Sequence, residues 1–315
     1  MSFGWLVRTP LRLGIAAILL VDIAVFGVDL FLLSNRSTTT VVDLQDALVD
    51  FRQGLDDDAT SVTSALAGGA AVTDTDAPAA PEVATIAAAE VPDVAQAPAP
   101  TIAAEPAAPS AFGLPAEGVY AYRTHGAETV SLLGARHEYP ATSYATVRHT
   151  GGCGWEIRSE VIREHVDARA MCSEPGQLLQ LGQSREVEFF GTRDGGAFVC
   201  SPPQVQHAIG EGEGTRSEGT CDDGKGSTVR LVRTTTGVGQ ETVGGEVVEV
   251  IRLRIEGTLS GRVRGTSLDE LTVVAATGLP VRWTRTVDSD ADAFGTTIKY
   301  QEQTAFDLVS LTPAT

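Results

Sequence analysis

The chain has 315 residues, of which 43% are hydrophobic, and it carries a formal net charge of −18. The acidic excess is uneven, because residues 1–36 carry a net charge of +1, residues 37–115 of −11 and residues 116–315 of −8. No part offers the basic surface that nucleic acid binding requires, and the length allows up to two domains.

The first predicted element is an apolar stretch from Leu13 to Leu33. At about 1.5 Å rise per residue, a helix of this length crosses a hydrocarbon core of roughly 30 Å. Arg8 and Arg12 precede it and acidic residues dominate behind it, so the positive-inside rule places residues 1–12 in the cytoplasm and the rest of the chain outside. A cleaved signal peptide is the alternative, but the stretch is long for one and no cleavage site or cysteine follows it. We therefore predict a single-pass signal anchor in the cell membrane.

Two acidic residues, Asp22 and Asp29, lie within this predicted transmembrane helix. Their separation of seven residues places them on the same helix face. An acid near the middle of a bilayer costs roughly 2.5–3.5 kcal/mol on insertion scales, so one interpretation is self-association of the helix or a partner in the membrane. The other interpretation is that Asp22 is protonated or that Asp29 reaches outward, with no function attached to either.

Behind the membrane helix, apolar residues recur at steps of three and four over residues 37–55. The residues that form this seam are Val41, Leu44, Leu48, Phe51 and Leu55. The spacing predicts a short juxtamembrane amphipathic helix. Two heptads are too few for an independent coiled coil, so the helix either pairs because the membrane concentrates it or lies unpaired.

Residues 56–115 are rich in alanine, proline and acidic residues, and they contain eight of the fifteen prolines. This composition buries too little apolar surface to fold, so it predicts a disordered linker. As a flexible coil, the linker is expected to hold the folded part of the chain away from the membrane.

From Gly118 onward, short segments of alternating polarity are separated by Gly, Pro or Asp turns. The predicted strands are residues 119–122, 129–133, 143–149, 155–165, 177–181, 186–190, 197–200, 228–233, 246–256, 271–276, 281–287, 296–301 and 305–311. No convincing helical segment lies between them, which favours an all-β antiparallel meander over an α/β sheet. Residues 116–315 are therefore predicted to be one extracytoplasmic β domain.

The four cysteines, Cys153, Cys172, Cys200 and Cys221, all lie in this predicted domain. An even number of cysteines in an oxidising compartment predicts disulfide bonds. Three pairings are possible, and the chain order favours Cys153 with Cys172 and Cys200 with Cys221. A zinc site is disfavoured because no Cys-x-x-Cys or Cys-x-x-His spacing is present.

Sequence motifs for catalysis are absent. In the segment Gly257–Gly261 the serine stands one place late for a nucleophile elbow, and Gly224–Ser227 lacks the spacing of a phosphate-binding loop. His125, His137 and His149 fall on different predicted strands or strand ends, so each is interpreted as structural or solvated. We expect no enzyme activity and no cofactor.

An Asp-x-Asp-x-Asp run at Asp288, Asp290 and Asp292 resembles the start of a calcium-binding loop. Ala293 and Lys299, however, occupy the positions that need glycine and glutamate in such a loop. The run is therefore interpreted as a polar hairpin tip, and no metal is expected.

The C-terminal part resembles a known family through five segments: Val243–Val247, Leu268–Leu271, Thr277–Arg282, Tyr300–Glu302 and Leu308–Leu311. These segments are similar to the last strands of envelope proteins related to the lipoprotein carriers LolA and LolB, over about seventy residues. This chain lacks the tryptophan that follows the aspartate in that family. Membership would imply a curved half-barrel able to hold an acyl chain, with no catalytic residue. Arginine outnumbers lysine 21 to two, which is typical of high-GC, actinobacterial-type genomes.

A half-barrel is expected to place Trp283, Val247 and Ile251 on its concave face, because burying an indole removes a large apolar area from water. The sequence thus favours a non-enzymatic, membrane-anchored domain that binds lipid, another apolar ligand or an envelope component. The alternative is a structural or protein-interaction module without a ligand pocket. An open apolar face would favour the first function, and a filled interior would favour the second.

Overall fold

The structure is a computed structural model that describes residues 39–54, 112–131, 134–293 and 296–315. The predicted membrane helix with Asp22 and Asp29, and the predicted linker as far as residue 111, lie outside the described residues. Within the described ranges, no helix combines the length and the apolar character that a bilayer crossing requires. The chain divides into two compact units, and all described strands belong to the unit formed by residues 1–51 and 109–315.

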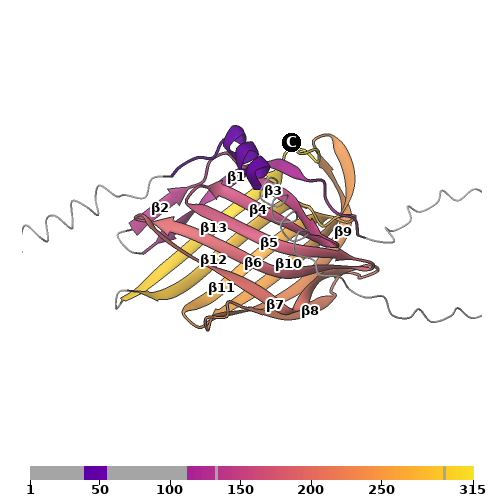
Figure 1. Ribbon diagram of the computed structural model, residues 1–315. Helices are drawn as coiled ribbons and strands as arrows, with labels where there is room; N and C mark the ends of the chain where they lie inside the picture. The colour runs from indigo at the N-terminus through magenta and orange to yellow at the C-terminus, as the bar shows by residue number, and fades with distance from the viewer. Residues whose placement is uncertain (1–38, 55–111, 132–133, 294–295) are drawn as a thin grey trace, which may run out of the picture. The chain divides into compact units, whose positions relative to one another are not determined.

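The described strands form one antiparallel sheet of thirteen strands in meander order (Figure 1). The strands are β1 (Gly118–Val130), β2 (Ala135–Glu138), β3 (Thr142–Gly151), β4 (Gly154–Ile162), β5 (His165–Glu174), β6 (Gln177–Phe189), β7 (Thr192–Ala208), β8 (Arg216–Asp222), β9 (Thr228–Val243), β10 (Glu246–Ser260), β11 (Val263–Val274), β12 (Pro280–Ala293) and β13 (Thr296–Leu308). The prediction of an all-β antiparallel meander is confirmed.

The sheet closes on itself because its last strand pairs with its first. Residues Tyr122–Val130 of β1 pair with Tyr300–Leu308 of β13. The other edge of β1 pairs with β3 through Gly118–Arg123 and with the short β2 through Ala127–Val130. Closure satisfies backbone groups that an open edge would leave unpaired. The described strands therefore form a closed sheet, whereas a half-barrel would leave its first and last strands as open edges.

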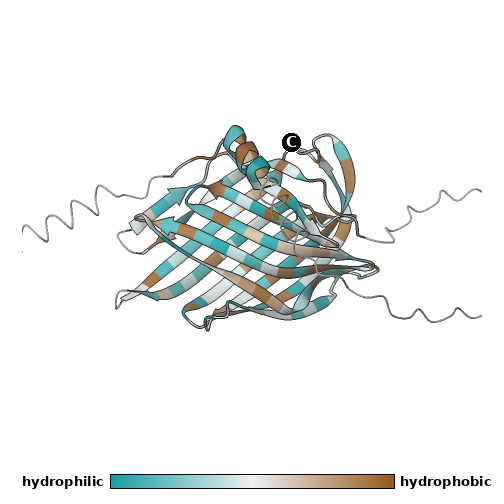
Figure 2. Cartoon of the chain, viewed as in Figure 1, coloured by the Kyte–Doolittle hydropathy of each residue, from teal (hydrophilic) through white to brown (hydrophobic). Residues whose placement is uncertain are grey.

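Side chains alternate between the inside and the outside of the closed sheet, as the period of two in a strand requires. Figure 2 shows hydrophilic and hydrophobic residues alternating along many of the strands. In β12, Val281, Trp283 and Arg285 are buried, whereas Arg282 and Thr286 are exposed. The apolar inward residues gather in one cluster, which includes Tyr122, Trp155, Ile157, Leu253, Leu271, Trp283 and Phe306.

Residues 44–54 form a helix within the range that the heptad spacing predicts (Figure 1). Asp43 caps it, because its Oδ1 accepts a hydrogen bond from the backbone N–H of Asp46 at 2.8 Å. The apolar seam packs against the chain's own β domain, and the buried residues of this contact are Val42, Ala47, Leu48, Phe51 and Val119. Leu48 and Phe51 of the predicted seam are thus covered by the β domain, whereas Val41 is 56% exposed.

Polar contacts fix the helix at two places. Arg163 forms an ion pair with Asp46 at 2.7 Å. The Nη2 atom of Arg148 donates to the carbonyl oxygens of Asp50 and Phe51 at 2.6 and 2.9 Å, and the guanidinium lies 5.7 Å from the centre of the Phe51 ring. These contacts attach the helix directly to the β domain, on the N-terminal side of the predicted linker.

Both favoured disulfides are present. Cys153 pairs with Cys172, and Cys200 pairs with Cys221. Cys153, Cys172 and Glu174 lie close enough to suggest a metal site, but the two sulfurs are bonded to each other and are not free thiolate ligands.

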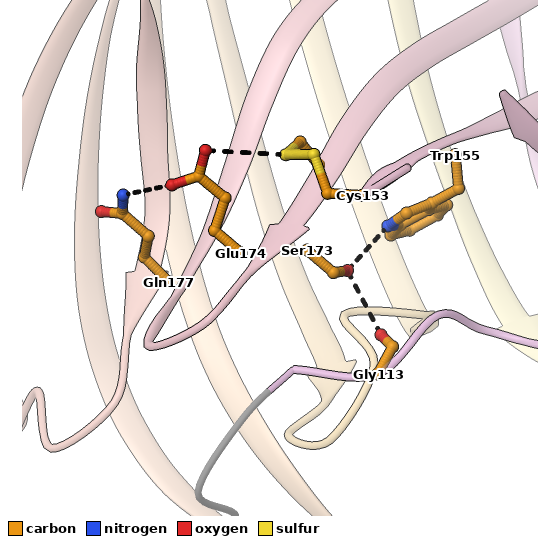
Figure 3. The surroundings of a disulfide bond; sticks show 7 residues. Gly113, Cys153, Trp155, Ser173, Glu174 and Gln177 are labelled. Carbon is orange, nitrogen blue, oxygen red and sulfur yellow. Dashed lines mark hydrogen bonds between the residues drawn. A yellow bond between two sulfur atoms is a disulfide. The ribbon is translucent and has the colours of Figure 1, made fainter. Parts of the chain in front are cut away.

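Beside the first disulfide, one hydroxyl joins three segments of the chain (Figure 3). The indole of Trp155 donates to Ser173 Oγ at 3.1 Å, and this hydroxyl donates to the carbonyl oxygen of Gly113 at 3.2 Å. The backbone N–H of Gly113 also donates to the carbonyl of Ala276 at 2.8 Å. The chain is therefore anchored where it enters the β domain.

Candidate functional site

A set of charged side chains is buried in the domain, and this is its least expected feature. The set consists of Glu128, His137, His165, Asp167, Arg169, Arg185, Asp269, Arg285 and Glu302. Apart from Arg185, whose side chain is 25% exposed, all of them are buried. Burying a charge is costly unless it is paired and hydrogen-bonded, so the partners of each group decide what the set can do.

Strand alternation and register bring these residues together. His165, Asp167 and Arg169 share one face of β5 because they stand two residues apart. Asp167 lies directly opposite Arg185 in the pairing of β5 with β6. Asp269 lies directly opposite Arg285 in the pairing of β11 with β12. The two cross-strand acid–arginine pairs then meet inside the closed sheet.

Asp269 is the centre of the first group of contacts. Its carboxylate accepts hydrogen bonds from Arg169 Nη2 at 2.9 Å, from the Trp283 indole at 3.0 Å, and from Arg285 Nε and Nη2 at 2.7 and 3.3 Å. Burial opposes ionisation of this acid, but the charges of Arg285 and Arg169 outweigh it and lower the pKa of Asp269. Both guanidiniums also lie 4.4 Å from the centre of the Trp283 ring.

Asp167 is the centre of the second group, and Arg285 joins the two. Asp167 accepts hydrogen bonds from Arg285 Nη1 at 2.7 Å, from Arg185 Nε at 2.9 Å and from His165 Nε2 at 3.2 Å. Burial opposes ionisation here as well, but Arg185 and Arg285 hold the pKa of Asp167 well below its usual range. Arg185 also forms an ion pair with Glu302 at 3.0 Å.

Glu128 organises the third group. Its two oxygens lie 2.6 Å from His137 Nδ1 and 2.6 Å from His165 Nδ1, and the hydroxyl of Tyr300 donates to it at 2.7 Å. His165 Nδ1 faces Glu128 and the Tyr139 hydroxyl, and Nε2 faces Asp167, an arrangement that favours the protonated ring, in which both nitrogens donate. Burial disfavours this cation, but the charges of Glu128 and Asp167 outweigh burial and raise the pKa of His165 to about 10.

His137 completes this third group and is buried completely. Its ring stacks on Phe189 with the ring centres 4.2 Å apart. Its Nε2 atom has no hydrogen-bond partner among the described residues. His137 thus lies at the edge of the network, where its Nδ1 contacts Glu128 and its ring stacks on Phe189.

Two small cavities border these groups. One of about 20 Å³ lies beside Tyr122, Trp283 and Phe306. The other, of about 100 Å³, is lined by Arg169, Arg185 and Arg285 together with polar and apolar residues. Pockets for drug-sized ligands usually measure roughly 300–1,000 Å³, so neither cavity has the volume of an acyl-chain site.

No protein-family model, no curated protein and no solved structure matches the chain. The similarity of the last strands to the lipoprotein carriers therefore stays a prediction. The function has to be inferred from the geometry of the site itself.

The structure does not bring the three predicted ligand-binding residues together. Trp283 and Ile251 are buried, but Val247 is 65% exposed. The physical reason is the length of the hairpin formed by β9 and β10, since the pairing of β10 with β11 ends at Val250. Val247 lies beyond that point and pairs only with Thr242 of β9. It therefore lies outside the interior that holds Trp283.

Other predicted positions also differ from expectation. The acidic run lies along the end of β12 and not at a hairpin tip, and Asp288 and Asp292 form ion pairs with Lys299 and Arg264. His137 belongs to the buried network, whereas His149 Nε2 lies 2.8 Å from the carbonyl oxygen of Pro115.

Sequence reasoning missed the charged network as a unit. One signal was present, because Arg285 shares the phase of Trp283 on its strand. If that phase points inward, the arginine is buried and needs an acid opposite it. No comparable signal identifies Asp167, because its neighbours on the same strand face, His165 and Arg169, are polar.

Proposed function

We propose that the β domain is a non-enzymatic module of the cell envelope that acts through its outer surface on another envelope component. Its membrane attachment rests on the predicted N-terminal helix. The observation that carries the proposal is the filled interior, in which Asp167, Asp269 and Glu128 are surrounded by arginine, histidine and tyrosine donors. A filled interior supports a module that works by contact, in preference to a container for an apolar ligand.

The buried network could also be compared with an active site, because perturbed pKa values cluster at such sites. Ion-pair networks with a structural role perturb pKa values in the same way. Glu128 and His165 have fully buried side chains, and their polar atoms are bonded to other protein groups. A substrate would need to displace these partners. We therefore interpret the network as structural.

The apolar-ligand hypothesis has less support. The indole that was expected to contact an acyl chain contacts Phe306, with ring centres 5.1 Å apart, and the guanidiniums of Arg169 and Arg285. The cavity beside it has a volume of only about 20 Å³. Lipid binding would require these side chains to move apart.

The test uses the full chain in its native membrane. A photo-crosslinking amino acid replaces, one at a time, four exposed valines of the β domain: Val199, Val238, Val247 and Val309, which are 63%, 64%, 65% and 42% exposed. We expect adducts with the same envelope protein from some of these positions and not from others, because a specific contact covers one part of the surface. In parallel, organic extracts of the purified chain are analysed by mass spectrometry. One acyl ligand per chain, together with no adduct at any position, would refute the proposal.

A further inference from the structure

We propose that the cavity of about 100 Å³ beside β5, β6, β11 and β12 is a binding site for a small anion, such as a halide ion or a short carboxylate, held chiefly by Arg169. The site goes beyond the surface contact proposed above and does not depend on it. It rests on the charges that line the cavity, on the hydrogen bonds that those charges already make, and on the size of the space.

The lining carries more positive than negative charge. Its charged members are Asp167, Arg169, Arg185, Asp269 and Arg285, which are three cations and two anions. The nearest further charges oppose each other, since Glu302 contacts Arg185 and protonated His165 contacts Asp167. Glu128 contacts His165 but does not line the cavity. The lining alone therefore carries a net charge of +1, which favours an anion over a cation, whereas the wider network with Glu128, His165 and Glu302 is balanced.

The donors of these residues are used unequally. All three nitrogens of Arg285 donate to Asp167 or Asp269. Arg169, by contrast, donates only through Nη2, to Asp269. Its Nε and Nη1 groups have no hydrogen-bond partner among the residues that the structure describes. The acids cannot serve them without giving up other donors, because both oxygens of Asp269 already accept two hydrogen bonds each.

The direction of the pKa shift of Arg169 agrees with its small number of hydrogen bonds. Burial lowers the pKa of Arg169, and although Asp269 opposes that effect, the neighbouring charge of Arg285 lowers the pKa further. A buried guanidinium in this condition is stabilised by an additional anion. The side chain is 10% exposed, and its Nε and Nη1 atoms are not fully enclosed, so a small solute can reach them.

The size and the lining restrict the class of anion. A water molecule takes up about 30 Å³ of the liquid, so the cavity has room for a few waters, a halide ion or a carboxylate group. Apolar residues, among them Phe198, Leu231 and Leu259, form the rest of the wall and suit a methyl group. The partial exposure of Arg185 and Phe198 offers a route from solvent.

The experiment uses the full chain, with bromide and acetate as probes at constant ionic strength. We expect Tm to rise with either anion and to reach a plateau, and crystals soaked in bromide to show an anomalous peak inside the cavity. The variant Arg169→Gln should lose the saturable rise. The matched control is Arg264→Gln, whose arginine is 54% exposed and pairs with Asp292 outside the cavity, and it should respond like the unaltered chain.

Three results would overturn the proposal. One is an equal Tm response of Arg169→Gln and Arg264→Gln, which would mean a general salt effect. The second is a cavity that contains only water in bromide-soaked crystals. The third is a bromide peak without any saturable Tm response, which would mean binding at crystal concentration only. If Arg169→Gln fails to fold, the crystals of the unaltered chain still decide, because the position of the anomalous peak does not depend on a variant.

Discussion

Replacing Asp269 by asparagine tests whether the buried network holds the domain together. The substitution keeps the size of the side chain but removes the negative charge that faces Arg169 and Arg285 at 2.9 and 2.7 Å. Two guanidiniums then remain buried with less compensation, and the new amide group cannot accept hydrogen bonds as both carboxylate oxygens do. Asp269→Asn is therefore expected to leave uncompensated positive charge in the interior.

The expected loss is large relative to the stability of a domain. Removing one partner of a buried ion pair costs about 3–5 kcal/mol, whereas whole domains are stable by about 5–15 kcal/mol. For a domain of this size, 1 kcal/mol corresponds to roughly 2–4 °C in Tm, so Tm should fall by about 10 °C. Urea unfolding followed by tryptophan fluorescence is the assay, because urea does not screen the ion pairs as guanidinium chloride does.

The matched control is Asp292→Asn on the same sheet. Asp292 pairs with Arg264 at 3.0 Å, but the two side chains are 57% and 54% exposed. Exposed pairs contribute about 0–1 kcal/mol, so this variant should unfold close to the unaltered chain. Equal and small losses of stability from both substitutions would refute the view that the buried ion pairs hold the domain together.

Three other predictions concern pH, the disulfides and topology. The pKa of His165 is raised to about 10 in the folded chain, above its unfolded value of roughly 6.5. Its contribution to the free energy of unfolding is therefore complete below pH 6.5 and is lost as pH rises through 10. Tm should fall over that range in the unaltered chain and change less in His165→Gln. Replacing Cys200 and Cys221 by serine should destabilise the domain by about 3 kcal/mol in the chain-entropy model, since the bridge closes a loop with a sequence separation of 21, and urea unfolding measures the loss. A reporter enzyme fused to the C-terminus should be active only outside the cytoplasm, and cytoplasmic activity would contradict the predicted membrane topology.

The strand pattern could be read from the sequence in outline, but not where a strand runs through glycine or lacks apolar residues. The prediction divides β1 between residues 122 and 129, whereas the strand continues through Gly126. A Cβ atom at that position would clash with the carbonyl oxygen of Gln303 on β13, so glycine permits the contact that closes the sheet. Strand β8 was missed because six of its seven residues are charged, polar or glycine, and its place is determined by pairing with β9.

The candidate site was harder to predict from the sequence because its charged residues stand at the inward-facing positions of their strands. Alternation alone assigns charged positions to the solvent side, which is the usual outcome. Asp167 and Asp269 are buried only because strands far apart in the sequence bring Arg285 between them. The docking of the helix formed by residues 44–54 is a similar case. The heptad spacing predicts the helix, but its partner on the sheet depends on Val119 and on Arg148.

Taken together with the predicted membrane helix, the docked helix sets how far the β domain can lie from the membrane. The chain leaves this helix after residue 54 and is anchored again at Gly113, so residues 55–111 start and finish at the same folded unit. With the predicted membrane helix ending at Leu33, only residues 34–39 precede Thr40, whose backbone N–H donates to Glu164 of the β domain, and at about 3.5 Å per residue they reach at most roughly 21 Å. Lengthening or shortening the stretch 55–111 would therefore leave that maximum distance unchanged, whereas even a few residues inserted before Thr40 would increase it.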